Sequence, residues 1–206
     1  MPTYTSPQDG TTLDTYLASN AATTNYAANA ALYAGEYAPA GTIYARSLLQ
    51  FPGLTDGTIP SASAILSASI FLRIEGDYSV NARTYRIYRS KRDVVIAQAT
   101  WNIWKTSNDW STAGGFHTDD CEQTDIGSAS FSATEAVNTW KEFALTPSAI
   151  QEIVNGTWTT PTLLVKADTE TDDQYGFYSS NDATSGNRPY IVVNYILGGQ
   201  VIIWSE

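Results

Sequence analysis

Residues 63–75 contain the longest strict alternation of apolar and polar residues in the chain. The apolar side of this pattern consists of Leu66, Ala68, Ile70, Leu72 and Ile74. A period of two is typical of a β-strand with one buried face and one solvated face. Because such a strand needs neighbours at its edges and a second layer over its apolar face, the pattern predicts a layered β-protein.

Further strands are predicted where short apolar runs are bounded by turn residues. These runs cover residues 14–17, 46–51, 83–89, 162–167 and 189–196. The run at 83–89 follows the central strand so closely that we expect the two to pair as an antiparallel hairpin or meander.

One short helix is expected after residue 145. Thr146 can cap it, Pro147 suits its first turn, and Asn155-Gly156 close it. Many short strands with a single helix predict an all-β fold, namely a two-layer antiparallel β-sandwich of jelly-roll type. We expect one domain over residues 1–197, because sandwiches of this size are common as single units.

Residues 198–206 form an apolar tail at a Gly-Gly break. Its side chains would be costly to leave in water, so we expect the tail to dock on this domain or on a neighbouring protein. The residues expected to make this contact are Val201, Ile202, Ile203 and Trp204.

The chain carries a formal net charge of -10, with an isoelectric point near 4.4. This charge argues against nucleic acid and anionic membranes, and no apolar stretch is long enough to span a bilayer. Five of the eleven basic residues lie between Arg83 and Arg92. This run is either a solvated strand face, which we favour, or a docking site for an acidic partner.

Cys121 is the only cysteine, which excludes an intrachain disulfide and a cysteine-based zinc cluster. The first residues show neither the basic start nor the apolar run of a secretion signal. We expect that a signal was removed, or that the protein leaves the cell by another route such as lysis after virus assembly.

Three tryptophans lie among Asn, Ser, Thr and Gly, at Trp101, Trp104 and Trp110. Flat aromatic faces complement the C–H faces of sugar rings and lose little side-chain entropy on binding. One interpretation is therefore a ligand-binding platform. The alternative, which we favour, is that Trp101 and Trp104 are core residues and only Trp110 is accessible.

Acidic loops are candidate calcium ligands, since calcium takes six to eight oxygens from flexible segments. The group we assign to metal consists of Asp168, Glu170, Asp172 and Asp173. Lesser options are the group Asp119, Asp120, Glu122 and Asp125, and the pair Asp14 and Asp182. Neither group matches the spacing of the twelve-residue calcium loop, so solvated loops are favoured. No other cofactor is expected.

No reaction centre stands out, and we expect no enzymatic activity. His117 is the only histidine, so spacing suggests neither a catalytic triad nor a two-histidine metal site. Two carboxylates far apart in sequence remain open as a glycoside-hydrolysis pair, but no residue is singled out for that role.

Seven short motifs follow one another along most of the chain. They are DTYL at 14–17, RSLLQF at 46–51, IPSASAILSASIFL at 59–72, ATWN at 99–102, WKEFALT at 140–146, TLLVKA at 162–167 and NRPYIVVNY at 187–195. In this order they resemble the DNRLRE-domain group, which is similar to carbohydrate-binding module family 96. The resemblance implies a non-catalytic β-sandwich, usually extracellular and attached to polysaccharide-active or surface proteins. The chain departs from that pattern, since neither a catalytic partner domain nor a secretion signal is visible.

Two functions from different classes follow. We favour a structural or adhesion protein of an extracellular assembly, with a phage or virus surface component, such as a head decoration or tail protein, as the leading case. The alternative is a stand-alone carbohydrate-binding module, and a polysaccharide-active hydrolase ranks third. The expected partners are other virion or surface-assembly proteins, further copies of the chain, and a glycan, with a location on a virion or extracellular surface.

Overall fold

The computed structural model describes residues 1–6, 12–37 and 42–198 of the chain. The strands within these ranges are β1 (Thr3–Thr5), β2 (Leu13–Ala18), β3 (Ala31–Tyr37), β4 (Ile43–Gln50), β5 (Ala64–Asp77), β6 (Arg83–Arg89), β7 (Ile103–Lys105), β8 (Asn108–Asp109), β9 (Gly127–Phe131), β10 (Trp140–Leu145), β11 (Leu163–Ala167), β12 (Tyr175–Tyr178) and β13 (Tyr190–Ile196). One α-helix, α1 (Pro147–Val154), and three 3-10 turns complete the described elements: η1 (Ser19–Ala21), η2 (Pro52–Leu54) and η3 (Ser185–Asn187). The predicted tail contacts at 201–204 lie outside the described residues.

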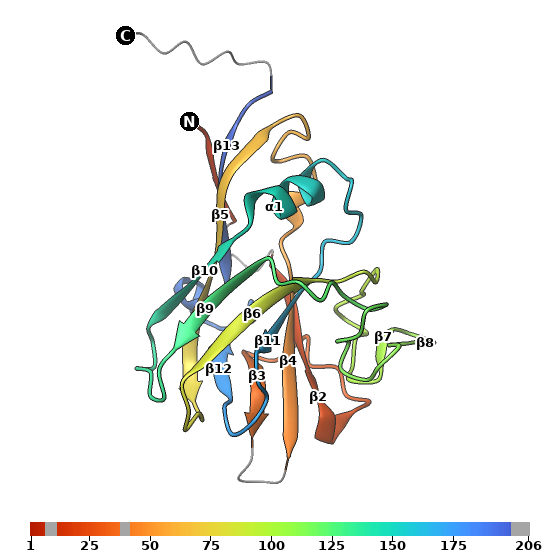
Figure 1. The fold of residues 1–206 in the computed structure, drawn as a ribbon, viewed down its shortest axis with the longest axis vertical. Coiled ribbons are helices and arrows are strands. Elements are labelled where there is room, and N and C mark those ends of the chain that lie inside the picture. The colour runs from red at the N-terminus through yellow and green to blue at the C-terminus, as the bar shows by residue number, and fades with distance from the viewer. Residues whose placement is uncertain (7–11, 38–41, 199–206) are drawn as a thin grey trace.

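Eight strands join through hydrogen bonds into a closed ring, in the order β5-β10-β9-β6-β11-β4-β3-β12 and back to β5. All pairings between the described strands are antiparallel. β13 and β1 extend the sheet beyond β5, β2 adds to β4, and β7 pairs with β8 apart from the ring (Figure 1). The all-β class with one short helix is confirmed, whereas the two expected layers are joined into a single barrel-like ring.

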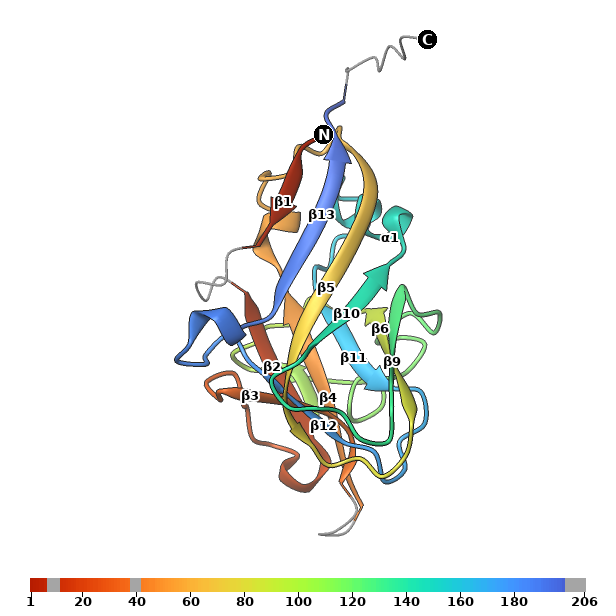
Figure 2. The same cartoon turned by 90° about the vertical axis from the view of Figure 1, so that its left-hand side faces the viewer.

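β5 is the longest strand and organises one side of the molecule. It lies between β13 and β10 along the long axis (Figure 2). The predicted alternation holds for its middle, where Ala68, Ile70, Leu72 and Ile74 are all buried.

Leu66 was expected on the same buried face, but 43% of it is exposed. The pairing with β13 shifts at this point, because Asn194 lies opposite Ser67 whereas Tyr195 lies opposite Ile65. Leu66 is therefore an extra residue on β5, and such a bulge reverses the alternation of the strand. The prediction for Leu66 is wrong for this reason.

The expected hairpin between β5 and β6 is also absent from the described pairings. β6 lies between β9 and β11 instead. β10 occupies the edge of β5 nearest to β6 in the ring, from Trp140 opposite Arg73 to Leu145 opposite Ala68. A six-residue pairing with a strand distant in sequence therefore replaces the local one.

Two apolar clusters hold this arrangement together. The larger fills the space enclosed by the ring and includes the fully buried side chains of Ile70, Tyr85, Phe143 and Phe177. The smaller lies on the opposite face of β2, β4, β6 and β11, beneath the segment that runs from residue 94 to 116. These strands are apolar on both faces, so that face of the ring is covered.

α1 has the predicted bounds, with Pro147 in its first turn. Ile150, Ile153 and Val154 share its buried face, which packs against β5 and η2. Thr146 occupies the N-cap position, although its side chain makes no capping hydrogen bond. No helix in the described ranges is long and apolar enough to cross a membrane.

Candidate functional site

The three tryptophans of the 101–110 segment do not form a common platform. Trp110 is only 5% exposed, packs in the smaller cluster, and donates its indole N–H to the carbonyl oxygen of Thr100 at 3.0 Å. Trp101 and Trp104 are half-buried at the margin of that cluster. We expected Trp101 and Trp104 in the core and only Trp110 accessible. This prediction is wrong, because Trp110 is the buried residue of the three.

Cationic side chains of the chain itself lie over the rings of the half-buried tryptophans. The guanidinium carbon of Arg46 is 5.2 Å from the ring centroid of Trp101. The ammonium of Lys105 is 4.4 Å from that of Trp104. These cation–π contacts use the ring faces that a sugar would need.

The arginine run from Arg83 to Arg92 meets acidic residues of the same chain. The ion pairs are Arg83 with Asp173 (2.7 Å), Arg86 with Asp125 (3.0 Å), Arg89 with Glu122 (2.6 Å) and Glu152 (2.7 Å), and Arg92 with Asp120 (2.9 Å). The four arginines of the run are thus paired within the chain and attach the acidic loops to the sheet. Lys91, the fifth basic residue of the run, is exposed and donates to the carbonyl oxygen of Thr118.

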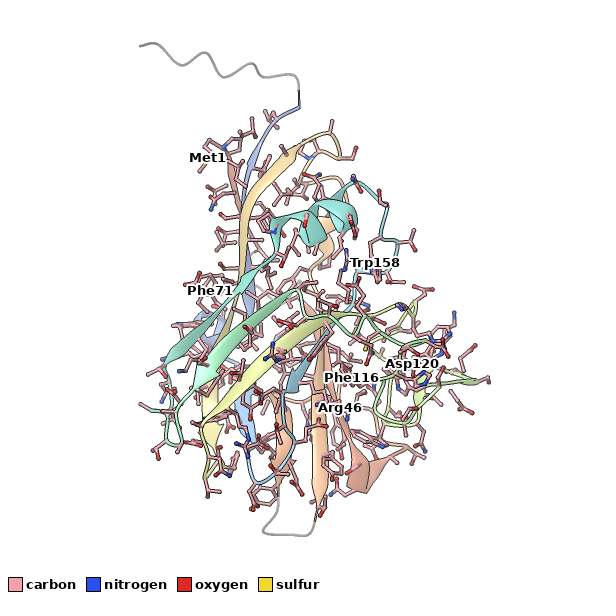
Figure 3. All side chains as sticks on the ribbon, in the orientation of Figure 1. Met1, Arg46, Phe71, Phe116, Asp120 and Trp158 are labelled. Carbon is pink, nitrogen blue, oxygen red and sulfur yellow. The ribbon has the colours of Figure 1, made fainter. Side chains whose placement is uncertain are left out.

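Asp120 shows how firmly these loops are held (Figure 3). Its carboxylate accepts hydrogen bonds from the backbone N–H groups of Ser111 and Thr112 and from Arg92. Burial by itself would raise the pKa of Asp120, but these donors together hold its pKa below the ordinary value of 3.8.

Of the four residues assigned to calcium, Glu170 and Asp173 form ion pairs with arginines, whereas Asp168 and Asp172 are exposed. Glu170 forms a bidentate pair with Arg46, at 2.9 and 2.8 Å, and Asp173 binds Arg83. Asp168 is exposed and accepts the N–H of Thr169. In the part of the chain that the structure describes, no group of three or more His, Cys, Asp or Glu residues is arranged to hold a metal ion.

A different set of aromatic residues is presented on the outward face of the sheet. Ile70 and Leu72 of β5 point into the core, so Phe71 between them points outward (Figure 3). The same alternation places Tyr190 of β13 and Trp140 of β10 outward, since Ile191 and Phe143 are buried. We call Phe71, Trp140 and Tyr190 the aromatic platform.

The strand register brings these three rings into contact. Tyr190 lies directly opposite Phe71, and Trp140 lies opposite Arg73 on the other edge of β5. The rings of Phe71 and Tyr190 are stacked, with centroids 4.7 Å apart and an angle of 8° between their planes. Trp140 meets Tyr190 edge to face at 5.0 Å. No described cation lies over these three rings.

Polar side chains border the platform. The hydroxyl of Ser69 donates to Glu142 Oε1 at 2.7 Å. Arg73 donates from Nε to the carbonyl oxygen of Asn138 at 3.0 Å and from Nη1 to the side-chain oxygen of Asn187. Arg73 is therefore held in place, and hydrogen-bonding groups of both kinds lie beside an apolar surface.

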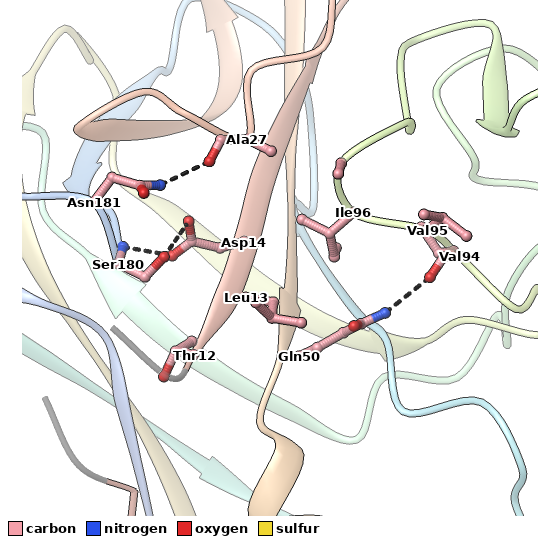
Figure 4. A pocket seen from close by; sticks show the side chains of 11 residues that line it. Thr12, Leu13, Asp14, Ala27, Gln50, Val94, Val95, Ile96, Ser180 and Asn181 are labelled. Carbon is pink, nitrogen blue, oxygen red and sulfur yellow. Dashed lines mark hydrogen bonds between the residues drawn. The ribbon is translucent and has the colours of Figure 1, made fainter. Parts of the chain in front are cut away.

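A separate cavity lies at the start of β2 (Figure 4). It has a volume of about 440 Å³ and mostly apolar walls, among them Leu13, Val94 and Ile96. Asp14 lies at its border, only 2% exposed, and accepts hydrogen bonds from the N–H and hydroxyl of Ser180 at 2.8 and 3.0 Å. Burial, only partly offset by these bonds, raises the pKa of Asp14 to about 7.

Asp14 thus has a structural role, since it attaches the loop after β12 to β2. Asp182, its suggested metal partner, accepts hydrogen bonds from Thr184 and Asn187 instead. Because the carboxylate of Asp14 is directed at Ser180, the cavity offers a ligand few free polar groups. We regard the aromatic platform as the better candidate site.

The sequence contained a signal for this platform that the spacing arguments missed. Phe71 interrupts the polar phase of the alternating strand, between Ser69 and Arg73. Trp140 and Tyr190 likewise occupy outward positions of strands whose other face is apolar. The register that places the three side by side comes from pairings between segments far apart in the chain.

The sequence matches the disaggregatase related repeat domain family over residues 17–193. The chain belongs to this family. All three residues of the platform, and all eight strands of the ring, lie within the matched region. Among curated proteins, none matches the chain significantly. The narrower resemblance to the DNRLRE-domain group and carbohydrate-binding module family 96 stays a prediction.

Proposed function

We propose that this member of the disaggregatase related repeat family is a non-catalytic glycan-binding domain. The observation that carries the proposal is the aromatic platform of Phe71, Trp140 and Tyr190, an outward-facing aromatic surface free of the chain's own cations. The resemblance to carbohydrate-binding β-sandwich modules supports the same ligand class and a jelly-roll ancestry for the ring.

The platform suits a sugar chain for two physical reasons. Rings that pack against one another on a sheet are held rigidly, so the C–H groups of a sugar can pack on their exposed parts with little loss of side-chain entropy. The surrounding Glu142, Arg73 and Ser69 offer an acceptor, a donor and a hydroxyl to sugar hydroxyl groups.

The virion surface role is a separate proposal and rests on other features. Its support is the apolar sequence of residues 201–204, which lie outside the described part of the chain. A glycan-binding domain is compatible with such a role, because surface proteins can adhere through sugars. The platform itself bears only on glycan binding.

Affinity gel electrophoresis tests the proposal. The protein would be run through gels containing a panel of neutral and acidic polysaccharides, beside Trp140→Ala and the matched control Trp104→Ala. We expect wild type and Trp104→Ala to be retarded by the same polysaccharide and Trp140→Ala to be retarded about tenfold more weakly.

Two outcomes would count against the platform. Free migration of the wild-type protein through the whole panel would remove the glycan proposal. Equal retardation of Trp140→Ala and wild type would show that the binding surface lies elsewhere on the molecule. Circular dichroism of both variants checks that each is folded.

A further inference from the structure

A second aromatic site lies where β2 and β3 approach each other. It is a cavity of about 190 Å³ whose aromatic lining is Tyr16, Tyr26, Tyr33 and Tyr37. We call it the tyrosine cavity. It is smaller than the roughly 300–1,000 Å³ typical of sites for drug-sized ligands, so it would admit one small group and not a sugar chain.

The rings around this cavity form walls at different angles. Tyr16 and Tyr26 are stacked, with centroids 4.1 Å apart and planes 14° apart. Tyr33 meets Tyr16 edge to face at 5.1 Å, with their planes at 81°. Two walls therefore meet at almost a right angle, as in the aromatic cages that surround alkylammonium groups.

Tyr16 and Tyr33 stay neutral over the whole physiological pH range. Burial, followed by the nearby Glu75 carboxylate, raises the pKa of Tyr33 to about 12. Burial also raises the pKa of Tyr16. The rings thus keep the electron-rich faces that attract a cation.

The charge around the cavity favours a cation over an anion or a neutral group. No charged side chain is among its described lining residues. Glu75 lies close behind Tyr33, and both side chains approach Gly176. A Cβ atom placed on Gly176 would be 2.8 Å from Glu75 Oε2 and 3.2 Å from Tyr33 Cε1. This Oε2 atom is buried and has no hydrogen-bond partner among the described residues. An unpaired buried oxygen of this kind is unusual and is often explained by an ion or water.

We propose that the tyrosine cavity binds an alkylammonium cation. The cation would lie in the cavity beside the tyrosine rings that line it, with its methyl or methylene groups in cation–π contact with them, and Glu75 would supply the compensating negative charge. The overall charge of -10 raises the local concentration of cations at the surface. This site is separate from the aromatic platform and does not depend on glycan binding.

NMR titration of the whole chain with tetramethylammonium chloride tests the proposal. Sodium chloride at equal ionic strength controls for screening, and tert-butanol controls for a neutral group of similar shape. We expect saturable shifts of backbone amides in residues 16–37 with tetramethylammonium alone. Choline added afterwards should compete for the same shifts, whereas glycine betaine, which carries a carboxylate, should compete more weakly.

Two variants locate the site, and a third separates it from the platform. Glu75→Gln keeps the shape but removes the charge, and Tyr26→Leu removes one ring of the stack. We expect each to weaken binding about 2- to 30-fold, the range of one cation–π or charge contact. Tyr190→Ala should bind tetramethylammonium like wild type while losing glycan binding.

Three results would overturn the proposal. One is the absence of saturable shifts in wild type, and another is an equal response to tert-butanol, which would make the cavity merely apolar. The third is unchanged affinity in Glu75→Gln. Because Glu75→Gln is conservative, this comparison stands even if Tyr26→Leu fails to fold.

Discussion

The two aromatic regions of this domain differ in what covers their rings. In the segment from Trp101 to Trp110, one ring is buried and the other two carry the chain's own cations. On the outward face of β5, β10 and β13 lie three half-buried rings, and Tyr190 contacts the other two. The first region uses its aromatic side chains to attach a long loop to the sheet, and the second keeps them at the surface, where we propose that they bind a glycan.

This difference shows that aromatic content is a poor guide to a binding surface. The 101–110 segment holds three of the six tryptophans, yet each has an intramolecular partner. The platform holds only one, but no cation of the described residues lies over its ring or over the two aromatic rings beside it. What decides availability is the set of groups that lie over each ring, which depends on the fold.

The largest expected effect is on the covered region. Trp110→Ala removes a buried indole from the smaller cluster, which should lower the free energy of unfolding by about 3–5 kcal/mol. Chemical denaturation followed by circular dichroism measures this change. A loss below 1 kcal/mol would mean that the segment contributes little to the fold and would break the comparison.

Asp120→Ala should have the next largest effect. It removes the acceptor of three hydrogen bonds and the partner of Arg92, at an expected cost of about 2–3 kcal/mol. Because the pKa of Asp120 is lowered in the fold, its contribution is present above its unfolded value of 3.8 and is lost as the pH falls through the lower folded value.

Hydrogen exchange near pH 3 and at pH 7 measures the pH part of this prediction. Amides of residues 111–112 should lose protection on acidification in wild type, while amides of β5 should keep theirs. In Asp120→Ala the protection at 111–112 should already be low at pH 7. An equal loss of amide protection in β5 would show that the 111–112 segment and the β5 strand do not respond separately to acidification.

Tyr190→Ala sharpens the comparison from the platform side. Tyr190 contacts both Phe71 and Trp140, and aromatic pairs are worth about 0.5–1.5 kcal/mol each, so we expect stability to fall by about 1–2 kcal/mol. Glycan retardation should fall at least tenfold. A folded variant that still binds with wild-type strength would contradict the proposed role.

Lys105→Ala should give the smallest effect. It uncovers one face of Trp104 and removes a partly exposed cation–π contact worth about 0.5–1 kcal/mol. Acrylamide quenching of tryptophan fluorescence should rise, whereas glycan retardation should stay unchanged. New retardation that disappears in Lys105→Ala/Trp104→Ala would show that covering by Lys105 was what kept this ring from acting as a second platform.

Local patterns predicted the helix and six of the thirteen described strands, namely β2, β4, β5, β6, β11 and β13. The bounds of α1 follow from Pro147 and Asn155-Gly156, and the alternation of Ala68 to Ile74 gives the buried face of β5 correctly. The prediction that Leu66 is buried is wrong because a bulge depends on the partner strand. Sequence spacing contains no information about that partner. For the same reason the closure of the ring was not foreseen.

The candidate site was harder to predict than the fold. The covering of Trp101 by Arg46 joins positions far apart in sequence, and so does the contact of Phe71 with Tyr190. The acidic loops were interpreted as solvated or as calcium ligands because their arginine partners lie on distant strands. Pairing of charges across the fold is set by topology, which single-residue patterns do not encode.

The closed hydrogen-bonded ring has a consequence for proteins that carry several such domains. The strands of the closed ring expose no continuous edge to which a neighbouring copy can add a strand, so any such edge belongs to strands outside the ring, such as β1 and β2. Consecutive copies on one polypeptide should therefore keep their rings separate, and each ring should unfold in its own transition. The combined affinity of several copies for a long ligand would then depend on the number of domains and on the length of the chain that connects them.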